Sequence, residues 1–262
     1  MVYRTDYHIH TNYSDGTAVF EDYLEYARKE GLREIGFSDH LTLTEKQQPW
    51  SMNPDLINDY CDKILKLKAN NTDIIIRLGL EVDFLPGKEE EIERITKELP
   101  LDYLIGSVHY MGEGSVDLGP EFYKEKDIDR LYESYFDLVS EAAETSLFDI
   151  MGHPDLVRIF RYFPANNPEQ LYRTLAINLK KSDVAIELNT NGMNKPLSNF
   201  YPDPNYLHLF REEGVPLCVN SDSHCPEDTA QYFNEAYTSV IKAGYSDMAI
   251  FDKRVRKMVP LI

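Results

Sequence analysis

The sequence contains few cysteines. Among 262 residues only Cys61, Cys218 and Cys225 occur, an odd number at wide spacing. This excludes a disulfide framework and a zinc site built from thiolates. No apolar run approaches the ~20 residues that a membrane-spanning helix needs. Met1 is followed closely by charged residues instead of the apolar core of a signal peptide. We therefore expect a cytoplasmic protein that does not enter a membrane.

Basic side chains are also scarce. The chain has 27 lysines and arginines against 45 acidic residues, which gives a net charge of -18 at pH 7. Such a protein repels nucleic acids and anionic membranes, so neither is an expected partner. A phosphorylated substrate would need local positive charge from metal ions or from a few cations. The sequence does not indicate an oligomeric state.

Short apolar runs alternate with amphipathic segments along the chain. Hydrophobic content of 42% suffices for one large core, and no linker or repeat divides the sequence, which predicts a single domain over residues 1–262. Seven apolar runs, several rich in Ile and Val, are predicted strands: 4–9, 33–38, 74–80, 102–108, 147–151, 184–189 and 216–220. Seven amphipathic segments are predicted helices: 18–30, 54–69, 87–98, 126–145, 167–181, 204–213 and 231–243.

Signals at the helix ends support these segments. Gly31 and Gly214 follow the last turns of two predicted helices, and Asn167 with Pro168 is typical of a helix start. Seven strand–helix units in succession predict a parallel sheet with right-handed crossovers. Both a closed seven-unit barrel and an open doubly wound sheet fit this pattern.

Six of the seven histidines lie at or near the ends of predicted strands. In His8-Ile9-His10 the strand alternation puts both imidazoles on one side, and Asp15 follows in a loop. Side chains at the ends of all strands converge only if the sheet closes, which favours a barrel with its site at the C-terminal face. The candidate metal ligands are His8, His10, Asp15, His40, Glu81, His109, His153, Asp222 and His224.

The donor types of these side chains indicate the metal. Imidazole and carboxylate without thiolate suit zinc, manganese or iron. Nine ligands exceed what one ion can use while it also binds substrate, so two or three divalent transition-metal ions are predicted. His208, the remaining histidine, lies within a predicted helix and is expected on its surface.

The motifs, in their order along the chain, resemble the polymerase and histidinol phosphatase (PHP) family. The resemblance spans nearly the whole chain and implies a distorted (β/α)7 barrel, similar to a TIM barrel, with a trinuclear metal site. Many family members have His where this chain has Asp15, a difference that bears on the third metal's identity or affinity. The matching motifs are His8-Ile9-His10, Ser14-Asp15-Gly16, Ser38-Asp39-His40, Gly79-Leu80-Glu81, Ser107-Val108-His109, Gly152-His153-Pro154 and Ser221-Asp222-Ser223-His224.

The resemblance also implies three ligand sets. The first ion would be held by His8, His10, Glu81 and Asp222. The second would share Glu81 as a bridge and use His109 and His153. The third would take Asp15, His40 and His224. Three divalent ions would outweigh the three carboxylates and leave the pocket cationic.

Within the family, residues 187–192 and the chain length are most similar to members that hydrolyse L-histidinol phosphate. The implied reaction is release of L-histidinol and phosphate, a step of histidine biosynthesis, by a metal-bridged hydroxide that attacks phosphorus. Glu81, Asp222 and His224 are the expected catalytic residues. The proton donor to the leaving alkoxide is left open among Asp222, His224, Asp83 and metal-bound water.

Few cations lie near the predicted strand ends. Arg158 and Lys195 are expected to bind phosphate oxygens, with Asn191 as a further substrate contact. The amine and imidazole of histidinol phosphate would need an acidic or aromatic rim. Tyr110, Glu113 and Asp117 are the candidates for that rim.

Three alternatives remain at this point. One is a PHP phosphoesterase with another substrate, such as phosphotyrosine in a protein or another small phosphomonoester. Another is an amidohydrolase-type barrel, which also begins with His-x-His but often uses a lysine at a strand end, where this sequence has none. The last is a metal-binding barrel without catalysis, which would be expected to have lost some of the nine ligands.

Overall fold

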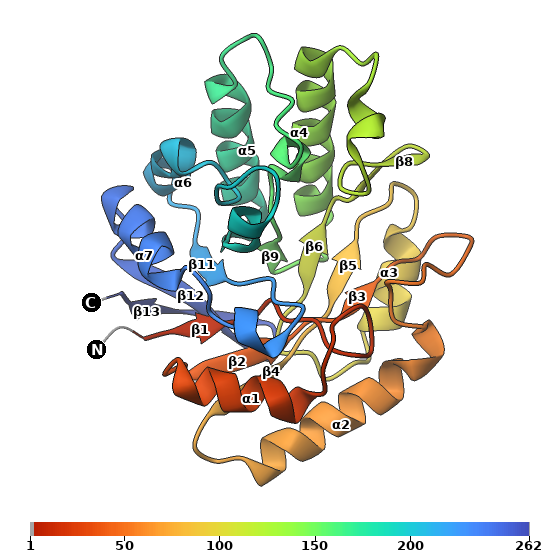
Figure 1. The fold of residues 1–262 in the computed structure, drawn as a ribbon, viewed down its shortest axis with the longest axis vertical. Helices are drawn as coiled ribbons and strands as arrows, with labels where there is room; N and C mark the ends of the chain where they lie inside the picture. The colour runs from red at the N-terminus through yellow and green to blue at the C-terminus, as the bar shows by residue number, and fades with distance from the viewer. Residues whose placement is uncertain (1–2, 262) are drawn as a thin grey trace.

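The computed structural model describes residues 3–261. Parallel strands occupy its centre and helices surround them (Figure 1). All seven predicted strands are present, and two are interrupted so that each forms two segments. The strands are β1 (Thr5–Asp6), β2 (Glu34–Phe37) with β3 (His40–Leu41), β4 (Ile75–Leu78) with β5 (Glu81–Asp83), β6 (Ile105–Ser107), β9 (Ile150–Met151), β10 (Ala185–Asn189) and β11 (Leu217–Asn220).

The strands close into a barrel. One sheet has the order β1-β2-β4 and the other β11-β10-β9-β6-β5-β3, with parallel pairing throughout both. A parallel bridge between Ile9 and Ser223 joins the first strand to the last. The His10 amide donates to the Ser223 carbonyl at 2.9 Å, and the Ser223 amide to the His8 carbonyl at 3.1 Å. The fold is therefore the closed, distorted seven-unit barrel and not the open sheet.

The seven predicted helices are also present, with ends that differ by a few residues. Gly31 and Gly214 have φ of 71° and 74°, a conformation that favours glycine and ends a helix. None of the helices within residues 3–261 combines the length and apolar character needed to cross a membrane. The helices are α1 (Phe20–Lys29), α2 (Ile57–Asn70), α3 (Glu89–Thr96), α4 (Ile128–Glu144), α5 (Glu169–Ser182), α6 (Leu207–Glu213) and α7 (Phe233–Lys242).

Two hairpins were not predicted from the sequence. The short one pairs β7 (Tyr110–Met111) with β8 (Gly114–Ser115) in the loop after β6. The longer one pairs β12 (Asp247–Asp252) with β13 (Val255–Pro260) and lies beside β1 (Figure 1). It packs against residues at the strand starts, so it covers the barrel end opposite to the C-terminal face.

The interior of the barrel is filled by aromatic side chains. The Tyr103 ring lies against Gly36 and Gly79, where an added Cβ would come within 2.4 Å and 2.3 Å of its atoms. Its hydroxyl donates to the Tyr7 and Phe37 carbonyls at 2.6 and 3.1 Å. Glycine is thus required on two neighbouring strands because a ring occupies the space between them.

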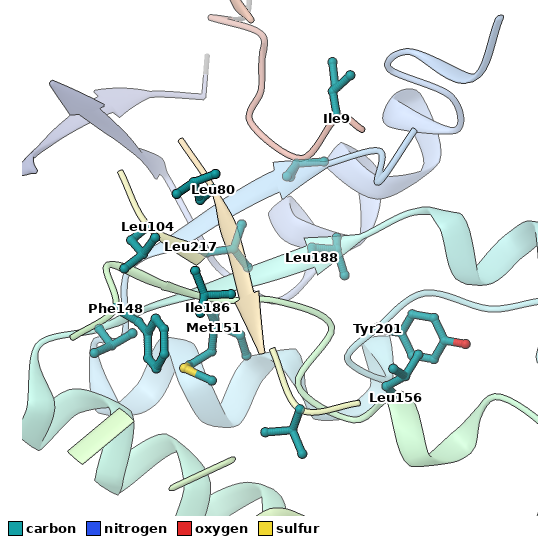
Figure 2. Packing of buried hydrophobic residues seen from close by; sticks show 14 of the residues in the cluster. Ile9, Leu80, Leu104, Phe148, Met151, Leu156, Ile186, Leu188, Tyr201 and Leu217 are labelled. Atoms are coloured by element: carbon teal, nitrogen blue, oxygen red, sulfur yellow. The ribbon is translucent and has the colours of Figure 1, made fainter. Parts of the chain in front are cut away.

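A larger apolar core lies between the strands and the surrounding helices. Figure 2 shows Phe148, Met151 and Ile186 gathered in one part of this core. The Phe148 ring lies over Gly106, where a Cβ would approach within 2.4 Å. Burial of such side chains stabilises the barrel by about 25 cal/mol per Å² of apolar surface. This scaffold fixes the strand ends that carry the polar residues described next.

Candidate metal centre and cavity

The structure brings the nine predicted ligands together at one end of the barrel. His8, His10, Glu81 and His153 are almost fully buried, and His40 and His109 retain little exposure. Each follows a strand end or lies on a divided strand, so the closed sheet determines their convergence. Asp15 comes from the loop after the first strand and is the most exposed of the carboxylates.

Glu81 lies at the centre of this arrangement. Its Oε2 is 2.7 Å from His40 Nδ1 and 3.2 Å from His8 Nε2. The same oxygen is 3.5 Å from His10 Nε2. Its Oε1 is 2.9 Å from His153 Nε2 and 4.0 Å from His109 Nε2. One carboxylate thus faces five imidazoles, and its role as a bridge between two ions stays a prediction.

The other two carboxylates face the same histidines from the rim. Asp222 Oδ1 is 3.2 Å from His10 Nε2 and 3.6 Å from His8 Nε2. Asp15 Oδ2 is 3.4 Å from His224 Nε2. Asp15 Oδ1 is 3.8 Å from His40 Nε2. The carboxylate that replaces the family's histidine therefore lies where a ligand is expected.

The donor atoms fit metal ions. Three groups have potential ligand atoms within 4.8 Å of one another. The buried atoms His8 Nε2, His10 Nε2 and Glu81 Oε2 have no hydrogen-bond partner within residues 3–261. Unpaired buried nitrogen and oxygen atoms are costly, and metal coordination would satisfy them. The groups are His10 with Asp15, His40 and His224; His8 with Glu81 and His153; and His8 with His10 and Asp222.

These groups overlap with the ligand sets implied by the resemblance but are not identical to them. His10 also lies with the Asp15 group, so it is shared between two clusters. His109 is not a member of the three groups, although its Nε2 is 4.0 Å from Glu81 Oε1. The assignment of single ligands to single ions therefore stays a prediction.

The electrostatics favour ionised carboxylates and one neutral imidazole. Burial alone would raise the pKa of Glu81 and of Asp222, but the surrounding histidines hold both pKa values well below their ordinary range. Burial also lowers the pKa of His10 to about 3, because His40 and His224 add to its effect. A neutral imidazole next to two carboxylates is the donor set that a divalent cation uses.

Two ligand candidates have unusual backbone conformations. His153 has φ of 24° and Asp222 has φ of 52°, both in the left-handed region. Such conformations cost about 1 kcal/mol or more for residues other than glycine and cluster at functional sites. At these two positions they direct the side chains toward Glu81 and toward His10.

Outer hydrogen bonds orient several ligands. Asp83 accepts from His109 Nδ1 at 2.6 Å and so fixes the orientation of that imidazole. Asp39 accepts from the Thr11 amide at 2.7 Å and from Ser14 Oγ at 2.7 Å, so it holds the loop that carries Asp15. Glu187 Oε1 is 2.7 Å from His8 Nδ1, a contact that was not predicted from the sequence, although the position of Glu187 in a strand that ends beside the site was a usable signal.

A cavity of about 320 Å³ opens above the metal-type residues. Lys195 and Asn191 line it, and Asp117 faces it from the loop after β8. The binding of substrate by Lys195 and Asn191 stays a prediction. Trp50, which the sequence analysis did not consider, also lines it and stacks on Tyr110 with ring centroids 6.3 Å apart. A wider groove of about 710 Å³ beside α4 holds none of the metal-type groups found in residues 3–261.

Arg158 requires a correction. Its guanidinium is buried and donates to Asp155 Oδ2 and Asp203 Oδ2, each at 2.9 Å, and to the Phe200 carbonyl at 3.1 Å. It is absent from the described residues that line the cavity. Because its donors are already paired with two carboxylates, we do not retain it as a phosphate ligand.

Comparisons with known proteins identify the family and support the fold. A family model described as the PHP domain matches residues 6–191. The match covers more than half of the chain, and the chain therefore belongs to the PHP domain family. Asp222 and His224 lie beyond the matched residues, and the structure places them beside the other candidate ligands.

Individual relatives are similar over nearly their whole length. A protein of Deinococcus radiodurans named "Probable histidinol-phosphatase" is 34% identical, over 97% of this chain and 98% of its own. A "Histidinol-phosphatase" of Lactococcus lactis is 27% identical, over 95% and 94%. The crystal structure of L. lactis histidinol phosphate phosphatase, complexed with zinc, L-histidinol and phosphate, has a TM-score of 0.84 at 24% identity, covering 98% of this chain and all of that one. This last likeness supports the barrel fold.

Proposed function

We propose that this protein hydrolyses L-histidinol phosphate to L-histidinol and phosphate with the help of bound metal ions. The observation that carries the proposal is the cavity, where metal-type side chains, one lysine and an aromatic and acidic wall face one another. The names of the two full-length relatives support the same substrate. A cytoplasmic location and the absence of nucleic-acid partners remain predictions.

The metal-binding part of the proposal uses the nine converging side chains. Zinc, manganese or iron suits their imidazole and carboxylate donors. When bound, two or three such ions would lower the pKa of a coordinated water and offset the negative charge on phosphorus. The residues that would hold them are His8, His10, Asp15, His40, Glu81, His109, His153, Asp222 and His224.

The chain's own residues would bind the two ends of the substrate differently. Lys195 is the one cation among the described lining residues, apart from the histidines, and would attract the phosphate together with Asn191. The Trp50 ring offers an aromatic face for the imidazole, and the Asp117 carboxylate offers an acceptor for the amine. Asp222 and His224 line the cavity and remain the predicted catalytic side chains beside Glu81.

The test is phosphate release by metal-quantified protein from four substrates. These are L-histidinol phosphate, p-nitrophenyl phosphate, a phosphotyrosine peptide and a short oligonucleotide. We expect kcat/KM for histidinol phosphate to exceed the others by about 100-fold, a difference of ~2.7 kcal/mol in transition-state binding. The Asp222→Asn variant, which loses a carboxylate of the site, is the inactive control.

Equal and slow turnover of all four substrates would reject the histidinol assignment while leaving a metal-dependent phosphoesterase. Preference for the peptide would instead favour the phosphotyrosine alternative. Absence of turnover by a fully metallated protein would reject phosphoester hydrolysis altogether.

A further inference from the structure

Glu187 is a fully buried carboxylate on β10, next to the metal centre but outside the cavity lining in the described chain. Its Oε1 is 2.7 Å from His8 Nδ1 and 2.8 Å from Asn220 Nδ2. Its Oε2 accepts from the His153 amide at 2.8 Å and from Asn189 Nδ2 at 3.0 Å. Four donors thus converge on two oxygens, which is the full capacity of an ionised carboxylate.

The hydrogen bonds of Glu187 determine which nitrogen of His8 faces the metal centre. Because Glu187 Oε1 can only accept, His8 Nδ1 must carry a hydrogen, so Nε2 is the nitrogen that a metal ion can use. That Nε2 points into the cluster, 3.2 Å from Glu81 Oε2, and has no hydrogen-bond partner among the described residues. A histidine held in this way by a carboxylate is oriented before the ion arrives.

The same carboxylate is also linked to Asp222 through one amide side chain. Asn189 Nδ2 donates both to Glu187 Oε2 at 3.0 Å and to Asp222 Oδ2 at 3.1 Å. Asp222 Oδ1 is then left facing His10 Nε2 at 3.2 Å. Asn189 Oδ1 in turn accepts from the Asn191 amide at 2.9 Å, so its own orientation is fixed.

We propose that Glu187 is a positioning residue that orients the metal ligands from beneath: His8 by its side chain, His153 by its backbone and Asp222 through Asn189. Glu187 itself binds neither metal nor substrate. The inference rests on the metal-binding part of the proposed function and is independent of which phosphoester is hydrolysed.

The test substitutes Glu187→Gln, which preserves size. A glutamine has a single acceptor oxygen, and its NH₂ group would face two of the four donors. We expect a 10- to 100-fold weaker metal affinity, the usual effect of losing such a partner. Affinity is measured by competition with a chelator, and the visible spectrum of the cobalt-loaded protein reports the coordination geometry.

Glu34→Gln is the matched control. Glu34 is equally buried and accepts from Tyr3 Oη, Tyr7 Oη and Arg77 Nε, but it lies at the start of β2, away from the ligands. Both variants are expected to lower the melting temperature of the metal-free protein. Only Glu187→Gln should change metal affinity and the cobalt spectrum.

The possible outcomes separate the two proposals. Wild-type affinity and spectrum in folded Glu187→Gln protein would overturn the positioning role, whereas failure of the wild type to bind metal would overturn the proposed function. If Glu187→Gln does not fold, Asn189→Ala decides in the same assays. A loss of at least about threefold in affinity would support the coupling to Asp222, and an unchanged affinity would contradict it.

Discussion

Glu81 is the side chain on which the metal centre depends most. Its two oxygens face five histidines that come from four different strands. The charge of Glu81 stabilises the cluster, because without it the buried imidazoles would have no carboxylate partner at the centre, which is costly. We therefore expect that replacement of this single residue would prevent the binding of several ions.

Trp50 provides a prediction about specificity at the same scale. Its ring contacts His40, with centroids 5.0 Å apart, and stacks on Tyr110. Trp50→Ala should raise KM for histidinol phosphate about tenfold, since aromatic contacts contribute ~0.5–1.5 kcal/mol. Steady-state kinetics with glycerol 2-phosphate, which has no ring, should show little change.

Trp50→Phe is the control for that prediction because it keeps an aromatic face. It should recover most of the affinity for histidinol phosphate. An equal loss for both substrates in Trp50→Ala would instead mean that the ring supports the metal ligands and does not select the leaving group.

Single residues also show what could be predicted from the sequence. The ligands His8 and His10 were predictable because strand alternation places both on one side. The role of Glu187 was not, because its partners lie on other strands and only the register brings them together. The pairing of Arg158 with Asp155 and Asp203 was not predicted, and the second of these carboxylates is distant in sequence.

Among the elements, the β12–β13 hairpin closes one end of the barrel. Phe251 is buried against Tyr7, with ring centroids 6.3 Å apart, and the Arg254 guanidinium pairs with Asp149. The Arg254 amide donates to the Asp102 carbonyl at 2.9 Å. These contacts fasten the hairpin over the starts of several strands at the end of the barrel that carries no ligand candidates.

Phe251→Ala should therefore lower the free energy of unfolding by about 3–5 kcal/mol, as is usual for removal of a buried aromatic ring. Urea denaturation measures this change. The folded variant should keep the wild-type kcat, because the hairpin lies opposite to the cavity. Val255→Ala, at a position 58% exposed on β13, is the control and should change stability by less than ~0.5 kcal/mol. A lowered kcat in folded Phe251→Ala would show that the hairpin acts on the site.

The strands and helices of the barrel were predictable because apolar runs and amphipathic periodicity recur regularly along the chain. The hairpin was missed because β13 is mostly exposed and rich in charge, so its pattern indicates no buried strand. Its position is determined by contacts with residues such as Asp102 and Asp149, about 100 residues or more away in sequence. Tertiary contacts of this kind override local sequence preference.

At the scale of the molecule, metal ions should stabilise the folded state in addition to taking part in the reaction. Ions that bind only the folded state add ~2.7 kcal/mol at a free concentration 100 times the dissociation constant. Chelation should then lower the melting temperature by about 5–10 °C in a chain of this size. Scanning calorimetry with and without chelator measures the shift, and added metal should reverse it.

Glu81→Gln serves as the control for chelation because it removes the central ligand. The melting temperature of this variant should be almost insensitive to chelator. A wild-type melting temperature that does not respond would mean that the clustered histidines and carboxylates are stable without ions.

The bridge between Ile9 and Ser223 also determines when the metal site can form. The first two ligands emerge early from a ribosome, whereas the residues that hold them in place, Asp222 and Ser223, are synthesised more than 200 positions later. During most of its synthesis the nascent chain therefore carries exposed histidines without a formed pocket. The complete set of ligands can come together only after the last strand has paired with the first.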